Sequence, residues 1–428
     1  MTALSSPEAY EAYIRKNETW NFVVNTLDLV FYNLAWSFIF SSTILTLYAS
    51  HLTSSATLIG LIPAIQSIGY FLPQLFMARQ TERLPRKKIL VQQVSVLERV
   101  PYLFVTLGIL LWPSAPNGFS FTVLALSLAT ATLAGGLASP AWQGMLAKVI
   151  SPRRRGFFFG LSQALGGLLG IGGAVISRQV LASYAYPLSF GLCFLFSFIA
   201  QALSWVCLSL NREPAKEPGK EAISSVDYWR RLPKVLRDNP NFARYLGSRA
   251  FIILGSMGTY FYVVYARHAF QITDAFAATL TIAALVSQTA FTPLLGWLGD
   301  RYGYKWLTEL STLIGAGTLV LVLLVPGATW FYGVFVLSNA ASSGMMVAGM
   351  SMTMEFSSPE DLPTFAALAN TILAFPILLS PVIGGWLIDG LSYQALFLAA
   401  LALLALGWSA MHWGVHEPRH EWQKSAAS

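Results

Sequence analysis

The chain has 428 residues, of which 55% are hydrophobic, 14% are aromatic and only 11% are charged. This composition excludes an ordinary soluble domain, which carries more charge, and favours a protein whose solvent is a lipid bilayer. The net charge of +7 is compatible with a nucleic-acid partner or with a membrane topology signal, and the positions of the basic residues decide between the two.

Long apolar segments follow a polar N-terminal stretch, and each is at or above the ~20 residues that cross ~30 Å of hydrocarbon. We therefore predict an all-α integral membrane protein with twelve transmembrane helices. The predicted spans are 22–49, 57–78, 88–112, 119–147, 157–181, 187–210, 244–266, 275–298, 306–326, 329–355, 363–388 and 391–414.

One polar segment, 211–243, interrupts this series. It contains the sequence "NREPAKEPGKEAISS", which is rich in Pro, Lys and Glu and has no apolar periodicity. Such a composition is typical of a flexible linker. The linker divides the spans six and six, and so predicts an N-terminal six-helix bundle at 1–210 and a C-terminal bundle with its tail at 244–428.

The basic residues are distributed unevenly among the predicted loops. Nearly all of the 27 Lys and Arg lie in the termini, in the linker and in the loops on the same side, whereas only Arg178 and Arg267 fall on the opposite side. By the positive-inside rule, both termini and the linker are cytoplasmic, in the inner membrane of a cell. The charge is thus a topology signal, and we expect no nucleic-acid partner.

The loop between the second and third spans occurs in related form in both halves. The stretch "GWLGDRYGYKWL" at 296–307 corresponds to "ARQTERLPRKKI" at 78–89. Internal repetition of this kind is typical of secondary transporters. The aligned positions are Gly296, Asp300, Arg301, Gly303 and Lys305 in the second half, and Ala78, Glu82, Arg83, Pro85 and Lys87 in the first.

The acids in these two loops suggest a gate. A carboxylate at a helix end attracts the exposed amides at the start of a neighbouring helix, which contributes about 0.3–1 kcal/mol. We predict that Asp300 faces the start of the fifth span near Gly156, and that Glu82 faces the start of the eleventh near Thr364. These contacts would close the cytoplasmic side. The alternative is a basic loop that only obeys the positive-inside rule.

The loop at 296–305 resembles the signature loop of the major facilitator superfamily, G-x-x-x-D-R-x-G-x-[RK]. The resemblance extends to the twelve spans, the central linker and the Arg155-Gly156 pair before the fifth span. In the first-half copy, Ala78 and Pro85 replace glycines, and Glu82 replaces aspartate. The resemblance implies two pseudo-symmetric six-helix bundles, transport by alternating access, and a cavity lined by spans 1, 4, 7 and 10.

Helical spacing places polar and aromatic side chains on one face of each of these four spans. Amide, hydroxyl, aromatic and thioether groups suit a neutral or amphipathic solute better than a polyanion, and ordinary helix packing is the alternative for each residue. The candidates for the substrate cavity are Asn25, Tyr32, Trp36, Ser139, Trp142, Gln143, Ser256, Tyr260, Asn339, Ser343, Met346 and Met350.

Four charged residues lie well away from the ends of the predicted spans, where a charge costs at least about 2.5–3.5 kcal/mol near the bilayer centre. Asp28 and Arg249 occupy equivalent places in spans 1 and 7, and so could form an ion pair. Glu98 and Arg99 are adjacent and point about 100° apart on a helix, so each is expected to need a separate partner. Asp28 or Glu98 is our candidate for a proton-coupling site, with a permanent structural ion pair as the alternative.

These observations predict a secondary transporter of a small molecule that works by alternating access in the lipid bilayer, with protons as the expected coupling ion. Abundant aromatic residues and methionines favour export of amphipathic or drug-like compounds. Proton-coupled uptake of a neutral solute such as a sugar is the alternative. A receptor or lipid-handling protein without turnover is the alternative from another class. We expect a monomer without cofactor or metal, and no enzyme activity, because no nucleophile–base pair or metal-ligand set stands out.

Overall fold

The computed structural model describes residues 7–82, 84–215, 234–357 and 362–418. All regular secondary structure in these ranges is helical. Twelve helices among the described residues are long and apolar enough to cross a membrane. The prediction of an all-α protein with twelve membrane spans is therefore confirmed.

The chain forms two compact units. Unit 1 comprises Met1–Thr53 and Ile65–Ala222, and unit 2 comprises Ser54–Ala64 and Ile223–Ser428. Ser54–Ala64 groups with the second half of the chain, and the boundary between the units falls within the segment 211–243. The helix Ala56–Glu82, α3, therefore contributes its first turns to unit 2 and the rest to unit 1.

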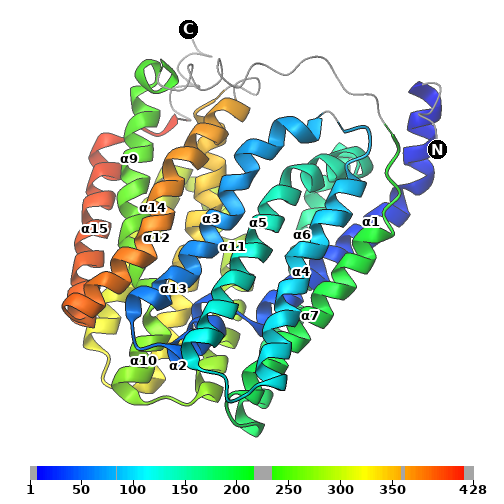
Figure 1. Cartoon of the computed structure of the whole chain (residues 1–428). Coiled ribbons are helices and arrows are strands. Elements are labelled where there is room, and N and C mark those ends of the chain that lie inside the picture. The colour runs from blue at the N-terminus through cyan, green and yellow to red at the C-terminus, as the bar shows by residue number, and fades with distance from the viewer. Residues whose placement is uncertain (1–6, 83, 216–233, 358–361, 419–428) are drawn as a thin grey trace. The chain divides into compact units, whose positions relative to one another are not determined.

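The long helices of unit 1 run side by side (Figure 1). The first span is much longer than predicted, because its helix begins at Pro7 instead of residue 22. Unit 1 contains α1 (Pro7–Phe38), a π-helical turn (Ser41–Leu45), α2 (Thr46–Leu52), the greater part of α3, α4 (Lys88–Leu111), α5 (Asn117–Val149), a 3-10 turn (Pro152–Arg154), α6 (Arg155–Ser183) and α7 (Leu188–Ser209).

Unit 2 repeats this pattern. Its third span ends at Leu324 and is followed by a short turn before the fourth, as the apolar pattern predicts. The elements of unit 2 are α9 (Pro240–Gly255), a 3-10 turn (Ser256–Tyr260), α10 (Tyr262–Phe270), α11 (Asp274–Tyr302), α12 (Tyr304–Leu324), a 3-10 turn (Ala328–Trp330), α13 (Phe331–Glu355), α14 (Leu362–Gly390) and α15 (Tyr393–Gly414).

The first span of each half is interrupted at an equivalent place. The π-helical turn at Ser41–Leu45 separates α1 from α2, and the 3-10 turn at Ser256–Tyr260 separates α9 from α10. Interrupted helices leave backbone groups without their helical partners, so they are stable inside a membrane protein only where protein or a cavity covers them. In transporters, such paired interruptions mark the substrate region.

The start of α3 is fixed to the end of α14 within unit 2. The Asp389 carboxylate accepts hydrogen bonds from the backbone N–H groups of Ala56 at 2.7 Å and Thr57 at 2.9 Å, and from the Ser55 hydroxyl at 2.8 Å. An acid is favourable there because the first amides of a helix have no helical acceptor and carry a partial positive charge. This cap explains why Ser54–Ala64 belongs to unit 2.

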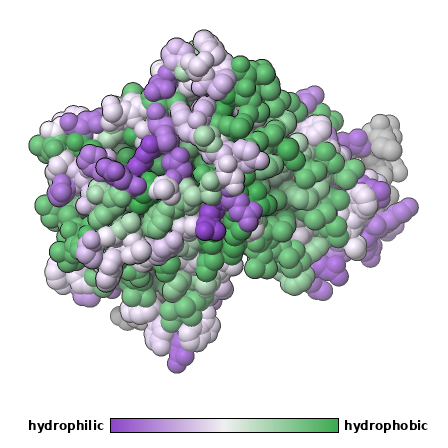
Figure 2. Space-filling view, turned by 90° about the horizontal axis from the view of Figure 1, so that it is seen from below, coloured by the Kyte–Doolittle hydropathy of each residue, from purple (hydrophilic) through white to green (hydrophobic). Residues whose placement is uncertain are grey.

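The outer surface of the helices is strongly apolar. Leu111, Leu324 and Trp413 expose 79%, 74% and 74% of their surfaces. Figure 2, which is seen from below onto the ends of the helices, shows hydrophobic residues at this end as well, beside groups of hydrophilic ones. Apolar patches of this extent are unusual on soluble monomers, and they suit helices that face lipid.

Candidate substrate and proton site

A cavity of about 350 Å³ lies inside unit 1 beside the break in the first span. Its wall is largely aromatic: Trp36 packs edge-to-face against Tyr32 and Tyr102, with ring centroids 6.3 and 6.2 Å away. Ser41, Gln66, Glu98, Thr132 and Gln201 add polar groups to this wall. The full lining is Tyr32, Trp36, Ser41, Gln66, Tyr70, Glu98, Tyr102, Ala131, Thr132, Gly135 and Gln201.

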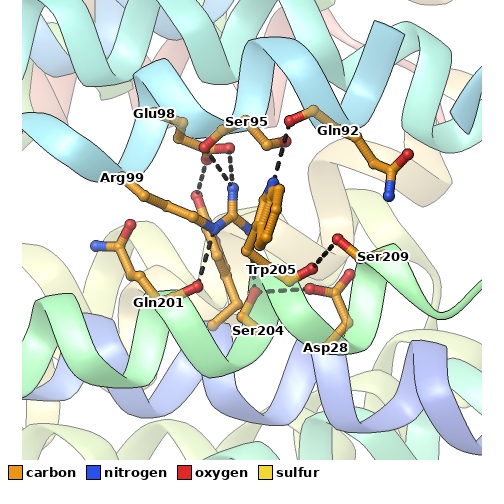
Figure 3. Close-up of polar contacts among 10 residues, drawn as sticks. Asp28, Gln92, Ser95, Glu98, Arg99, Gln201, Ser204, Trp205 and Ser209 are labelled. Atoms are coloured by element: carbon orange, nitrogen blue, oxygen red, sulfur yellow. Dashed lines mark hydrogen bonds and ion pairs between the residues drawn. The ribbon is translucent and has the colours of Figure 1, made fainter. Parts of the chain in front are cut away.

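Glu98 connects this cavity to a buried charge network. One carboxylate oxygen, Oε1, accepts a hydrogen bond from the Tyr32 hydroxyl at 3.0 Å, and the other, Oε2, lies 3.0 Å from Nη1 of Arg99. Figure 3 shows the Arg99 side chain reaching from α4 toward α7. There it donates to the backbone oxygen of Gln201 at 2.9 Å and to the Ser204 hydroxyl at 3.0 Å.

Asp28 completes the network from α1. The Ser204 hydroxyl donates to Oδ1 of Asp28 at 2.6 Å, so one serine bridges the carboxylate and Arg99 (Figure 3). Asp28 and Arg99 expose only 4% and 5% of their surfaces, and Trp142 lies beside the aspartate. The network thus contains two carboxylates and one guanidinium. With all three ionised, it carries one uncompensated negative charge.

Glu98 and Arg99 were expected to need separate partners, and the structure adds an ion pair between the two residues themselves. Their Cα–Cβ directions do diverge on the helix, but both side chains are long enough to bend toward a common point. Each also has the separate partner that was expected, Tyr32 for Glu98 and Ser204 for Arg99.

A second cavity, of about 290 Å³, lies inside unit 2 beside the break in the seventh span. Arg249, Ser256 and Met346, all predicted from the sequence, line it. The ninth and twelfth spans also contribute, which the family resemblance did not imply. The other lining residues are Ile252, Ile253, Gly255, Thr259, Tyr262, Ser311, Thr312, Gly315, Thr318, Leu319, Ser338, Ala341, Ser342, Met345 and Leu404.

The remaining cavity candidates of unit 1 lie outside this lining. Asn25 is 1% exposed and accepts a hydrogen bond from Asn211, which follows the end of α7. Ser139 lies 3.3 Å from the Tyr70 hydroxyl and accepts a hydrogen bond from Gln143. These residues pack between helices, so their place in a substrate path stays a prediction.

In unit 2, the cavity side of α13 is rotated relative to the predicted stripe. Ser342 and Met345 line the cavity, whereas Ser343 is 1% exposed and does not. Asn339 donates to the backbone oxygen of Phe335, and Met350 exposes 65% of its surface. Tyr260, at the end of the 3-10 turn, is half-buried and outside the lining.

The loop at 296–305 forms a tight turn between α11 and α12. Gly303 has φ +99° and ψ 152°, a conformation that is essentially restricted to glycine. Asp300 accepts a hydrogen bond from the Tyr304 hydroxyl, and the Arg301 guanidinium lies 5.6 Å from the centre of the Trp297 ring. Gly296 lies within α11 with open space around it.

The other predicted gate residues are only partly described. Arg83 lies outside the described residues, and so does the side chain of Glu82. Lys87 places its ammonium group against Gly144 of α5. Arg155 donates to the backbone oxygens of Ala147 and Ile150, and so caps the end of α5, while Gly156 follows in the first turn of α6. The predicted role of these residues in gating stays a prediction.

Sequence reasoning missed one acid in each half. Glu213, which follows the sixth span, accepts a hydrogen bond from the backbone N–H of Lys88 at 2.7 Å and pairs with Lys148 at 2.8 Å. Glu417, which follows the twelfth span, accepts one from the backbone N–H of Lys305 at 3.2 Å. In both units, an acidic residue that follows the last span thus caps the N-terminal end of the third span. The only sequence signal is a Glu-Pro pair at each place.

Comparisons with known proteins identify the fold and the family. None of the curated proteins matches the sequence. Among solved structures, the nucleoside transporter NupG is similar with 12% identity and a TM-score of 0.71, covering 92% of this chain and 99% of its own. A D-xylose-proton symporter is similar with 16% identity, a TM-score of 0.70 and coverage of 94% and 99%. The human organic anion transporter MFSD10 is similar with 14% identity, a TM-score of 0.63 and coverage of 92% and 99%.

At these identities the structures show a common fold and no more. The family model described as Major Facilitator Superfamily matches residues 29–267 and 248–428, which together span most of the chain. The match agrees with the resemblance of the loop at 296–305 and with the twelve apolar helices. The chain belongs to the major facilitator superfamily of membrane transporters.

Proposed function

We propose that this transporter is proton-coupled and that Glu98 is its proton site. The observation that carries the proposal is the position of Glu98, whose carboxylate lines the unit 1 cavity and joins the buried network of Asp28, Ser204 and Arg99. With one negative charge in excess, the network becomes neutral when it binds a single proton. Neutralisation matters because an uncompensated charge is costly inside the membrane.

Asp28 is the weaker candidate of the two acids. It is 4% exposed, accepts a hydrogen bond from Ser204 and does not line the cavity. Glu98 faces a cavity that could hold water or substrate, whereas Asp28 is buried outside its lining. We assign Asp28 the role of holding Arg99, through Ser204, in the position where it pairs with Glu98.

The chemistry of the cavity supports an amphipathic substrate, and export of amphipathic or drug-like compounds is the first activity to test. Trp36, Tyr32 and Tyr102 offer aromatic faces, and Glu98 offers a hydrogen-bond acceptor beside them. Uptake of a neutral solute such as a sugar is the second candidate, because the Gln66 side chain also lines this cavity. Its amide can donate hydrogen bonds to hydroxyl groups and accept hydrogen bonds from them.

Transport by purified protein in proteoliposomes tests the proposal. Wild-type protein, Glu98→Gln and Asp28→Asn are compared with and without an imposed pH gradient. Glu98→Gln removes the titratable group but keeps an acceptor for Tyr32, so we expect substrate movement that no longer responds to the gradient. Asp28→Asn is expected to retain a response. A full response in Glu98→Gln would remove this residue from the coupling mechanism, and binding without any flux would favour a receptor.

We also propose that the loop at 296–305 and its counterpart at 78–87 form the cytoplasmic gate. The proposal is supported by the acid that each carries next to basic residues, at the end of the second span of each half. Asp300→Asn is expected to open the cytoplasmic side more often. A cysteine is introduced in the pathway on the membrane side of the gate, and its rate of modification by a membrane-impermeant thiol reagent measures how often the cytoplasmic side is open. An unchanged rate would contradict the proposal.

A further inference from the structure

The unit 2 cavity contains a guanidinium group without an acidic partner. Arg249 lies on α9, nine residues and therefore about 14 Å after the start of that helix at Pro240. Its Nη1 donates to the backbone oxygen of Met345 at 3.2 Å and lies 3.3 Å from the Met345 sulfur. Its Nε is buried and has no hydrogen-bond partner among the described residues.

The shape of α13 leaves room for this group. A Cβ atom at Gly349 would lie 2.7 Å from Nη2 of Arg249, so a side chain at this position would displace the guanidinium from its place against the helix. Within the described part of unit 2, no carboxylate forms an ion pair with Arg249. Asp28, which the sequence suggests as its partner, already accepts a hydrogen bond from Ser204 within unit 1.

Hydroxyl groups surround the cavity beside Arg249. Ser311 is 1% exposed and lines the cavity, and its Oγ has no hydrogen-bond partner among the described residues. Buried hydroxyl groups normally have a partner, and an orphaned one calls for an explanation. Ser342 also lines the cavity, whereas Met346 and Leu404 supply an apolar wall.

A half-buried arginine without a counter-ion inside a membrane span is unfavourable, and a bound anion would relieve the cost. The planar guanidinium matches a carboxylate, because two parallel N–H groups can donate to its two oxygens. Neither Met345 atom can neutralise the positive charge. A single cation calls for one negative charge, and a cavity of about 290 Å³ admits only a small molecule.

We propose that the unit 2 cavity binds the carboxylate of a small amphipathic monoanion, with Arg249 and Ser311 as its polar ligands. The apolar body of the anion lies against Met346 and Leu404. This inference rests on the proposed transport function, since it names the charge class of the substrate. It narrows the amphipathic compounds considered above to organic anions.

Binding by the purified full-length protein tests the charge class directly. Titration calorimetry in detergent micelles compares octanoate with octanamide, and 2-naphthoate with 2-naphthamide, so that each pair differs only in the charged group. At least one carboxylate is expected to bind about tenfold more tightly than its amide, because it gains charge-assisted hydrogen bonds. Equal affinities within both pairs, or no binding of either carboxylate, would overturn the proposal.

Variants connect this preference to the cavity. In Arg249→Met the ratio of the two affinities is expected to fall to about one, and in Arg249→Lys part of it remains because the charge remains. Arg244→Gln is the matched control, because Arg244 lies on the same helix but is exposed. A preference that survives in Arg249→Met would contradict the proposal. Ser311→Ala, a milder change, is expected to weaken carboxylate binding and leave amide binding unchanged.

Flux of the same compounds separates this inference from the proposed function. Carboxylate binding that depends on Arg249 but leads to no transport would contradict the proposed function and leave the anion site standing. Transport of amides as fast as carboxylates, with no effect of Arg249→Met, would contradict the anion site and leave proton-coupled transport standing.

Discussion

Replacing Gly303 with alanine tests the turn that carries the family's signature loop. Gly303 has φ +99° and ψ 152°, and residues with a Cβ atom adopt this region only at a cost of about 1–3 kcal/mol. The new Cβ atom would also lie 2.7 Å from Oε2 of Glu417. That oxygen accepts the backbone N–H of Lys305, so the glutamate must move away from the helix start that it caps.

These two effects together set the expected magnitude. Losing one charge-assisted hydrogen bond at a partly exposed site costs about 1 kcal/mol, so Gly303→Ala is expected to lower stability by about 2–4 kcal/mol. The thermal unfolding midpoint of the purified protein in detergent measures the change. Gly296→Ala provides the control, because Gly296 lies in the same loop motif but within α11 and has open space around it.

The control is expected to keep or slightly raise the midpoint, since alanine favours helix over glycine by about 0.5–1 kcal/mol. In a background that carries Glu417→Ala, Gly303→Ala should cost less, because the crowding has gone while the backbone strain remains. Equal midpoints for Gly303→Ala and Gly296→Ala would refute the reasoning.

Two further predictions concern the charged contacts of unit 1. Glu213→Ala is expected to lower the unfolding midpoint by an amount equivalent to about 2–3 kcal/mol, because it leaves the Lys88 amide and the half-buried Lys148 ammonium without their acceptor; an unchanged midpoint would contradict this cap. Arg99→Lys is expected to lower the midpoint even though charge is conserved, since lysine cannot reach Ser204 and the Gln201 carbonyl at once. An unchanged midpoint would show that the planar guanidinium, with its several N–H donors, is not needed here.

The membrane spans were predictable because hydropathy alone determines which segments can cross lipid. The breaks at Ser41–Leu45 and Ser256–Tyr260 were not, since both stretches remain apolar enough to continue a span. Their position depends on packing against other helices, which a single sequence does not record. The breaks matter because each one borders a cavity.

Helical spacing placed Tyr32 and Trp36 on one face of α1, and both line the unit 1 cavity. It was less successful for α13, where Ser342 lines the cavity and Ser343 does not. Neighbouring residues on a helix differ by about 100° in direction, and a sequence without known packing partners leaves that rotation open.

The charge network was predictable in its members but not in its connections. Asp28, Glu98 and Arg99 stand out as ionisable residues in apolar spans, and they do lie in one network. Ser204, which joins them, is one of many serines and carries no distinguishing signal. Its role becomes visible only in the structure, where α7 packs against α1 and α4 and brings Ser204 between Asp28 and Arg99.

Proton movement that accompanies substrate flux tests the central proposal most directly. Proteoliposomes with a trapped pH-sensitive dye receive the amphipathic compounds, and protein-free liposomes correct for passive permeation. The proton-coupled mechanism predicts that a transported compound changes the internal pH with wild-type protein and not with Glu98→Gln. Flux through the wild-type protein without any movement of protons would contradict it.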